Sequence, residues 1–209
     1  MRRLLLALLL AIPALASAQE GPPRRVRPFN IPSASMLPTL EIGDYVLTDL
    51  TDGAMPQRGD IVVFRPPSDP SIDYVKRVVA IPGDRVAIRE GRLVLNGSPI
   101  PRADKGDSVI DQGDFTETVH RYIETLPGGR AYAIVKRTDQ GAMNNTEETT
   151  VPPHTFYVLG DNRDNSVDSR ADNVKGYQWL GPIPLGNLVS TVHSIYWSRN
   201  RARVGQTVE

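Results

Sequence analysis

Short runs of β-branched and aromatic residues, each bounded by turn-forming residues, recur along most of this 209-residue chain. The run Ile61–Phe64 is typical of a buried strand, and the sequences at 82–84 (PGD) and 96–97 (NG) favour tight turns. After the N-terminal residues, no segment keeps a helical period for three turns. We therefore expect a mainly β fold, a folded sheet or partial barrel, with strands at 45–47, 61–64, 74–81, 85–88, 93–95, 131–135, 155–159 and 188–197.

The first eighteen residues have the order of an export signal. Two arginines precede an apolar run over residues 4–15, and the small residues Ala16, Ser17 and Ala18 follow. As a helix, residues 4–18 would span roughly 22 Å at about 1.5 Å per residue, less than the roughly 30 Å hydrocarbon core of a bilayer. We expect residues 1–18 to be a signal peptide cleaved before Gln19, or a short membrane anchor.

The rest of the chain divides into a linker and one main domain. Residues 19–30 contain adjacent prolines and three arginines, which disfavours a helix or a central strand, so we expect a linker whose arginines lie near anionic lipid head groups. Residues 31–209 have the length of one domain. A polar stretch from about residue 102 to 152 indicates a small inserted β lobe on that domain.

Composition excludes several kinds of partner. Lys plus Arg and Asp plus Glu are 24 each, so there is no charge surplus of the kind that binds nucleic acid. The chain has no cysteine, which excludes thiolate metal ligands and cysteine catalysis. His120, His154 and His193 are far apart and have no metal-ligand spacing. We expect no metal, no cofactor and no nucleic-acid partner.

Three segments contain the candidates for chemistry: residues 31–40 (IPSASMLPTL), 73–78 (DYVKRV) and 160–170 (GDNRDNSVDSR). Taken singly, each has an ordinary structural interpretation: a turn shaped by serines and prolines, a strand with an outward-facing lysine, and a solvated loop. A calcium loop fits the third segment poorly, because Arg163 or Val167 would occupy a required ligand or glycine position.

Together the three segments resemble the type I signal peptidase family, whose nucleophile motif has the form Pro-Ser-x-Ser-Met-x-Pro-Thr-Leu. Their order is the family's order, and the sequences at 59–60 (GD) and 82–84 (PGD) fit its intervening pieces. The resemblance covers about residues 31–184 and implies the fold of that family. Ala34 stands where many members have glycine, and its Cβ beside Ser35 would narrow the substrate cleft.

The residue types also make chemical sense. A serine hydroxyl is a weak nucleophile unless a base takes its proton, and the three segments contain no histidine. Lys76 is the remaining base, and to be neutral its pKa must fall by roughly 2 to 3 units from about 10.4. Burial among apolar neighbours can lower it, and these neighbours are Tyr74, Val75, Val78 and Val79. We expect Arg77 to face the other side of the strand.

The resemblance implies a serine endopeptidase in which Ser35 is the nucleophile and Lys76 the general base. Its substrate would be an exported preprotein with small residues at the first and third positions before the cleaved bond. Ile31, Pro32 and Tyr74 are our candidates for the shallow apolar pockets that bind those residues. The enzyme would act at the outer face of the cytoplasmic membrane, or in the periplasm if residues 1–18 are removed.

Four further residues receive supporting roles from the resemblance. Ser166 would hydrogen-bond the lysine amine, Asp168 and Arg170 would brace that loop, and Ser33 would add its hydroxyl to an oxyanion hole beside the Ser35 amide. Met36, an apolar residue next to the nucleophile, would either dip into lipid or pack in the core.

Three alternatives remain open at this stage. A self-cleaving repressor can use the same Ser/Lys pair, but the export signal argues against it. A specialised maturation protease for pilin or conjugation proteins is compatible with the short chain. A non-catalytic periplasmic β domain could keep these motifs as scaffold.

Overall fold

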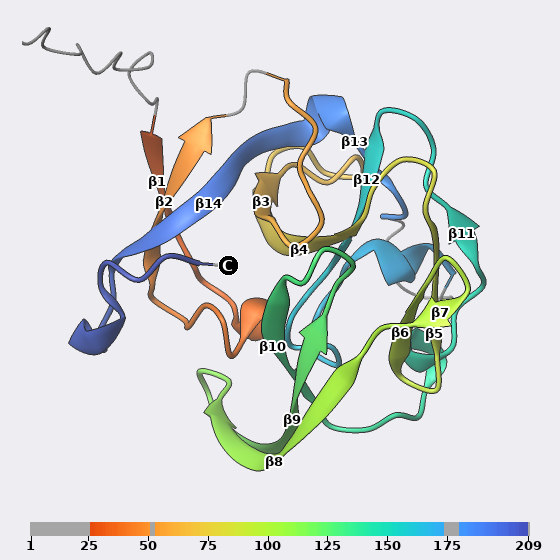
Figure 1. Cartoon of the computed structure of the whole chain (residues 1–209). Helices are drawn as coiled ribbons and strands as arrows, with labels where there is room; N and C mark the ends of the chain where they lie inside the picture. The colour runs from red at the N-terminus through yellow and green to blue at the C-terminus, as the bar shows by residue number, and fades with distance from the viewer. Residues whose placement is uncertain (1–25, 51–52, 174–179, 209) are drawn as a thin grey trace, which may run out of the picture.

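The computed structural model describes residues 26–50, 53–173 and 180–208, and this part of the chain is mainly β, as expected (Figure 1). The largest sheet has seven strands in the order β1-β2-β14-β3-β4-β12-β13 and curls strongly. Its strands are β1 (Val26–Asn30), β2 (Tyr45–Leu50), β3 (Ile61–Phe64), β4 (Tyr74–Ala80), β12 (Thr155–Leu159), β13 (Ile183–Pro184) and β14 (Leu188–Trp197).

Two smaller sheets pack beside the large one. The first has the order β10-β9-β8 and the second the order β11-β5-β6-β7. Their strands are β5 (Arg85–Arg89), β6 (Arg92–Leu95), β7 (Ser98–Pro99), β8 (Arg102–Asp111), β9 (Thr116–Thr125), β10 (Ala131–Lys136) and β11 (Thr149–Thr150). Residues 102–152, where the sequence predicted an inserted lobe, contain β8, β9 and β10 of the first small sheet and β11 of the second.

Every strand expected from the sequence is present within a few residues, and β3 shows why such runs are informative. Ile61 and Val63 point into one hydrophobic cluster, while Val62 and Phe64 point into another, so all four residues are buried. A strand covered on both faces needs a continuous apolar run rather than an alternating one.

The expected linker is partly a strand. Residues 26–30 form β1, which pairs with β2 at the edge of the large sheet. Pro28 lies within it, opposite Leu47, and an edge strand tolerates proline because one of its sides has no neighbour to bond. The other linker residues, 19–25, lie outside the described residues.

The same is true of the predicted signal peptide or anchor, residues 1–18. Within the described ranges, the structure contains no helix with the length and apolar character needed to cross a bilayer.

Candidate active site

Ser35 lies in a single 3₁₀ turn, η1 (Ala34–Met36), that directly follows extended backbone at Ser33. The Ser33 hydroxyl is 3.2 Å from the Ser35 hydroxyl, oxygen to oxygen. Ala34 and Met36, on either side of Ser35, are buried, and Met36 packs in the cluster that contains Ile31. Met36 is therefore a core residue that anchors the turn, and the expectation that it dips into lipid is wrong.

Lys76 reaches the nucleophile turn from the middle of β4. Its Nζ donates to Ser35 Oγ at 2.8 Å and to the carbonyl oxygen of Val75 at 2.9 Å. The residue is only 5% exposed, and its amine lies 5.3 Å from the centre of the Tyr74 ring. Burial lowers the pKa of Lys76 to about 8, although the Asp168 and Asp161 carboxylates act in the opposite direction.

Arg77 faces the opposite side of β4, as expected from the alternation of a strand, and its guanidinium is fully buried. It forms two hydrogen bonds with the Asp161 carboxylate, at 2.9 and 2.8 Å. Asp161 also accepts a hydrogen bond from the Thr39 hydroxyl at 2.5 Å. All three motif segments therefore meet in one buried network behind Ser35 and Lys76.

The segment after β12 also supports the nucleophile turn directly. Asn162 donates from its backbone to the Ser35 carbonyl and from its side chain to the Ala34 carbonyl, both at 3.1 Å. Gly160 has to be a glycine, because a Cβ there would collide with the Ser166 side chain and the Ser35 carbonyl. This close approach brings the loop against the turn.

Ser166 differs from the expectation. Its hydroxyl is buried in the cavity wall on the side of Asp168 and makes no hydrogen bond with the Lys76 amine. The second hydrogen bond of the Lys76 amine goes to the Val75 carbonyl instead. The implied Ser166–Lys76 hydrogen bond is therefore not present in this structure.

Asp168 and Arg170 form the expected pair and are both buried. The Arg170 guanidinium donates to the two Asp168 carboxylate oxygens, each at 2.8 Å, and the Gly160 backbone donates to the same carboxylate at 3.0 Å. Burial raises the pKa of Asp168, but the charge and hydrogen bonds of Arg170 and the Gly160 N–H outweigh burial. The net pKa of the carboxyl group is lowered, so it stays ionised. The pair closes the loop that contains Ser166.

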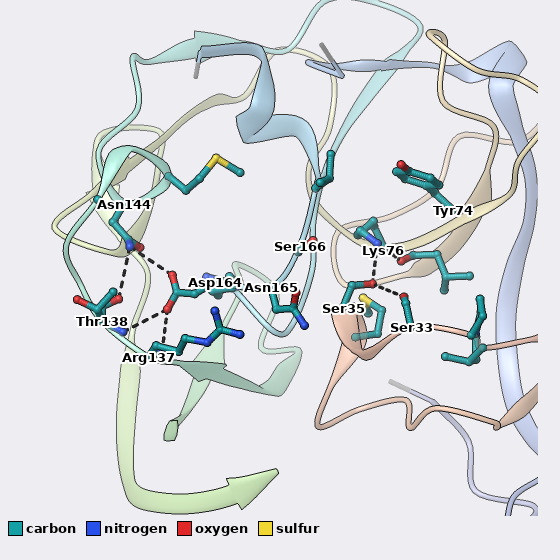
Figure 2. Close-up of a pocket in the computed structure, with 18 of the residues that line it drawn as sticks. Ser33, Ser35, Tyr74, Lys76, Arg137, Thr138, Asn144, Asp164, Asn165 and Ser166 are labelled. Carbon is teal, nitrogen blue, oxygen red and sulfur yellow. Dashed lines mark hydrogen bonds between the residues drawn. The ribbon is translucent and has the colours of Figure 1, made fainter. Parts of the chain in front are cut away.

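Ser33, Ser35, Lys76 and Ser166 border a cavity of about 740 Å³ with two different ends. Its apolar end is lined by Phe29, Ile31, Pro32, Met36, Tyr74 and Val75, which includes all three candidates for the substrate pockets. Its polar end is lined by Arg137, Thr138, Gln140, Asn144, Asp164 and Asn165. Figure 2 shows Ser33, Ser35 and Lys76 on one side, Arg137, Thr138 and Asn144 on the other, and Asn165 and Ser166 between them. None of the three histidines lines this cavity.

The arrangement joins a hydroxyl to an amine that can be neutral near physiological pH. A neutral Lys76 could take the Ser35 proton over 2.8 Å, which is within the range for general-base catalysis.

Comparison with known proteins agrees with this chemistry. The family model described as signal peptidase, peptidase S26, matches residues 2–197. The chain belongs to this family. Signal peptidase I from Pseudomonas aeruginosa is 37% identical over 190 residues, which cover 83% of this chain and 65% of that protein. Signal peptidase I from Rickettsia conorii is 31% identical over 201 residues, which cover 83% of this chain and 72% of that protein.

A solved structure of a signal peptidase I from Enterococcus faecalis V583 is also similar, with 23% identity and a TM-score of 0.39 over 66% of this chain and 97% of that chain. The family assignment rests on the sequence matches.

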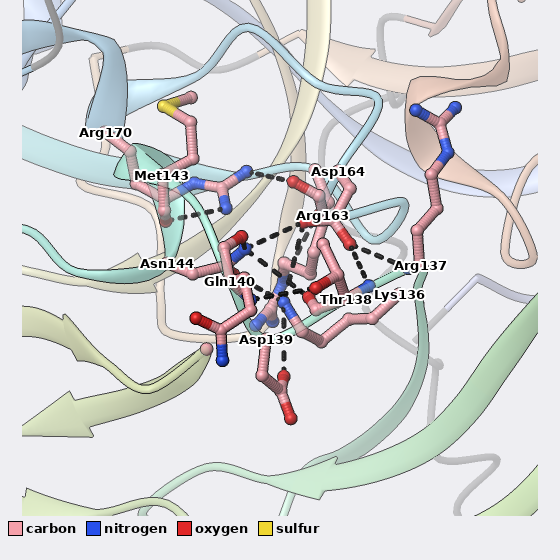
Figure 3. A network of polar contacts seen from close by, with 12 residues as sticks. Lys136, Arg137, Thr138, Asp139, Gln140, Met143, Asn144, Arg163, Asp164 and Arg170 are labelled. Atoms are coloured by element: carbon pink, nitrogen blue, oxygen red, sulfur yellow. Dashed lines mark hydrogen bonds and ion pairs between the residues drawn. The ribbon is translucent and has the colours of Figure 1, made fainter.

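In this member of the signal peptidase family, the polar end of the cavity is held by a compact network (Figure 3). Asp164 accepts backbone hydrogen bonds from Arg137 at 2.7 Å and Thr138 at 3.2 Å, and a side-chain bond from Asn144 at 3.3 Å. Lys136 lies behind them, with its amine 2.6 Å from Asn144 Oδ1 and 3.6 Å from the Asp164 carboxylate.

Sequence reasoning missed most of this polar end. Asp164 and Asn162 belong to the motif 160–170, so the motif itself was a signal, although it gave them no role. Arg137, Thr138 and Asn144 lie in the polar lobe, where nothing in the sequence distinguishes a cavity wall from a solvated loop.

Proposed function

We propose that this chain is a signal peptidase, a serine endopeptidase that removes N-terminal signal peptides from exported preproteins. The observation that carries the proposal is the 2.8 Å contact between Lys76 Nζ and Ser35 Oγ, with burial lowering the pKa of the amine to about 8. The shared family and the names of the two relatives support the substrate class.

In the proposed reaction, neutral Lys76 accepts the Ser35 proton while Ser35 Oγ attacks the carbonyl carbon of the scissile peptide bond. The resulting ammonium then protonates the leaving amine as the C–N bond breaks, and an ester on Ser35 remains. Lys76, neutral again, takes a proton from water as the water oxygen attacks the ester carbonyl carbon. The lysine ammonium then gives that proton to Ser35 Oγ as the ester C–O bond breaks, which releases the signal peptide and restores both groups. Protons and electron pairs balance over the cycle, and no cofactor is required.

Ser33 is the proposed side-chain donor of the oxyanion hole. Its hydroxyl lies 3.2 Å from Ser35 Oγ, so it is near the point where the attacked carbonyl oxygen would sit. Together with the Ser35 backbone N–H it would stabilise the negative charge that develops there. Asp168 and Arg170 would act through the loop they close, and Ser166 would line the site without contacting Lys76 in the resting enzyme.

The apolar end of the cavity is the proposed site for the residues that precede the cleaved bond. Ile31 is 2% exposed and forms the floor, whereas Pro32 is exposed and Tyr74 is half-buried. Shallow walls of this kind fit small side chains better than large ones. Ala34 does not line this cavity: it is buried with Ile110 and Val119 on the other side of the turn, so the expectation that its Cβ narrows the substrate cleft is wrong.

The proposed location is the outer face of the cytoplasmic membrane, where preproteins arrive with their signal peptides in lipid. Residues 1–18 support this location by their basic, apolar and small-residue order. They would act as a short anchor, or as a signal peptide whose removal leaves Gln19 as the first residue and the enzyme in the periplasm.

The test is to incubate the full chain with a purified preprotein and to sequence the N-terminus of the product. We expect a single cut after a residue such as alanine at the known end of the signal peptide. Ser35→Ala protein, prepared in parallel, should give no product while showing an unchanged melting temperature. Cleavage at scattered sites, or equal cleavage by the Ser35→Ala variant, would refute the proposal, and a pilin-type precursor as second substrate would reveal a narrower maturation protease.

A further inference from the structure

The hairpin of β8 and β9 packs against the nucleophile turn from the inserted lobe. Ile110 and Val119, one from each strand, belong to the same buried cluster as Ala34 and Val135. The turn that joins the two strands, residues 112–115, therefore has a fixed position relative to Ser35. Nothing in the motif segments accounts for this contact.

Gln112, at the start of that turn, reaches into the motif loop. Its Oε1 accepts hydrogen bonds from the side-chain amides of Asn165, at 2.8 Å, and Asn162, at 3.3 Å. Asn162 also holds the Ala34 carbonyl, and Asn165 lines the cavity. One glutamine from the lobe thus contacts both the support of the nucleophile turn and a wall of the cavity.

Glu117, the second residue of β9, continues the chain of contacts. Its carboxylate accepts from Gln112 Nε2 at 2.9 Å and from Arg137 Nε at 2.9 Å. Arg137 lines the polar end of the cavity, and both recorded contacts with Glu117 are made by Nε. Neither terminal nitrogen of this guanidinium contacts an acceptor in the part of the chain that the structure describes, so both remain as donors for a ligand.

The direction of each hydrogen bond in the series Glu117–Gln112–Asn165 follows from the chemistry of the side chains. An ionised carboxylate only accepts hydrogen bonds, so the Gln112 amide must turn its nitrogen to Glu117 and its oxygen to Asn165. Asn165 must in turn present its nitrogen to Gln112, which leaves its oxygen as a free acceptor. The polar end of the cavity thus combines an amide acceptor from Asn165 with guanidinium donors from Arg137, the complement of the N–H and C=O groups of a peptide backbone.

We propose that Gln112 and Glu117 are positioning residues, and that they hold Asn165 and Arg137 to bind the backbone of the polypeptide that follows the cleaved bond. This inference rests on the proposed function, in which the preceding residues occupy the apolar end. A peptide that enters there and passes Ser35 must leave through the polar end. Recognition of the backbone suits this side, because mature proteins begin with different sequences.

The experiment uses two synthetic peptides that are identical up to the cleaved bond. The short peptide ends one residue after the bond, and the long peptide continues for about six residues. Wild-type enzyme should cleave the long peptide with the higher kcat/KM. Gln112→Ala should lower kcat/KM for the long peptide by about tenfold, mainly through KM, as expected for about 1.4 kcal/mol of lost hydrogen bonding. For the short peptide the loss in kcat/KM should be clearly smaller, because that peptide does not reach the polar end and only the 3.3 Å contact of Gln112 with Asn162 bears on the nucleophile turn.

Two further variants separate positioning from simple stability. The exchange Gln112→Glu with Glu117→Gln reverses the polarity of the link between residues 112 and 117 and leaves one oxygen at position 117, 2.8 Å from Arg137 Nε, as an acceptor, so it should restore part of the long-peptide rate. Thr118→Ala changes an exposed neighbour on β9 and should match the wild type on both peptides. Melting temperatures are measured for all variants.

The outcomes are distinct. Equal losses on the two peptides, or unchanged kinetics with a lowered melting temperature, would mean that Gln112 is only structural and would overturn the inference while the proposed function stands. If the wild type cleaves neither peptide nor a whole preprotein, the proposed function fails and this inference fails with it.

Discussion

Two lysines of this protein are buried near opposite ends of the cavity, Lys76 in its wall and Lys136 behind the residues of its polar end, and only Lys76 lies beside a serine. Lys76 is 5% exposed and Lys136 is 2% exposed. Burial lowers the pKa of each to about 8, as the main cause in both cases. Their surroundings differ: the Lys76 amine contacts the Ser35 hydroxyl, whereas the Lys136 amine contacts the Asn144 side-chain oxygen and has the Asp164 and Asp139 carboxylates at 3.6 and 3.7 Å.

The comparison teaches that a lowered lysine pKa does not by itself identify a catalytic base. Both amines can lose a proton near physiological pH, but only Lys76 has a hydroxyl within reach from which to take one. Lys136 has acceptors around it, so its role is to hold the polar end of the cavity together. The group beside the amine, a serine hydroxyl or a set of acceptors, determines whether the lysine has a catalytic or a structural role.

The most severe test of this comparison is to remove each amine in turn. Lys76→Met should lower kcat by about 10³-fold or more, because it removes the amine that contacts Ser35 and general-base catalysis alone contributes about 10² to 10⁴. Lys136→Met should keep kcat within about tenfold of the wild type. Steady-state kinetics on one preprotein-derived peptide measure both, and equal losses in the two variants would break the distinction.

A second difference is that Lys76 has two serine hydroxyls nearby, those of Ser33 and Ser35, whereas the Lys136 amine contacts an amide oxygen. Ser33→Ala should lower kcat by about 10²-fold with little change in KM, since an oxyanion donor acts mainly in the transition state. Ser33→Thr keeps the hydroxyl and should recover much of that rate. If Ser33→Ala is instead fully active and merely melts at a lower temperature, Ser33 only shapes the turn before η1.

The smallest expected effect concerns stability against pH. The pKa of Lys136 is about 8 in the folded chain, below the ordinary lysine value of 10.5, so between these pH values the group binds fewer protons in the folded than in the unfolded chain. Stability therefore rises with pH across this window, by up to about 1.4 kcal/mol per pH unit for one such group. Lys136→Met should flatten the rise seen in urea unfolding of the wild type at pH 8 to 10. Identical slopes would show that Lys136 titrates normally.

The sequence predicted the strands and the Ser35–Lys76 pair for physical reasons that can be named. Buried strands such as β3 need continuous apolar runs, and a serine without a nearby histidine leaves a buried lysine as the base. The order of the three motifs supplied the pairing of residues that are 41 positions apart.

The features that the sequence did not predict have no local pattern to mark them. β8 is polar along most of its length and is held by pairing with β9, with its register shifted between Asp104 and Asp107, so no alternation marks it as a strand. Gln112 acts through contacts with Asn162 and Asn165, which only the fold brings near. The expected Ser166–Lys76 bond is absent, and the Lys76 amine instead contacts the Ser35 hydroxyl and the Val75 carbonyl on its own strand.

The central claim, that neutral Lys76 is the base for Ser35, is tested most directly by the pH dependence of kcat/KM, which reports ionisations of the free enzyme. Activity should rise from weakly acid pH along a single limb with its midpoint near the lowered pKa of about 8. Because Lys136 has a similar pKa, the same profile is measured on Lys136→Met, and the account predicts that the limb remains there. A flat profile in the wild type, or a limb that disappears in Lys136→Met, would contradict it.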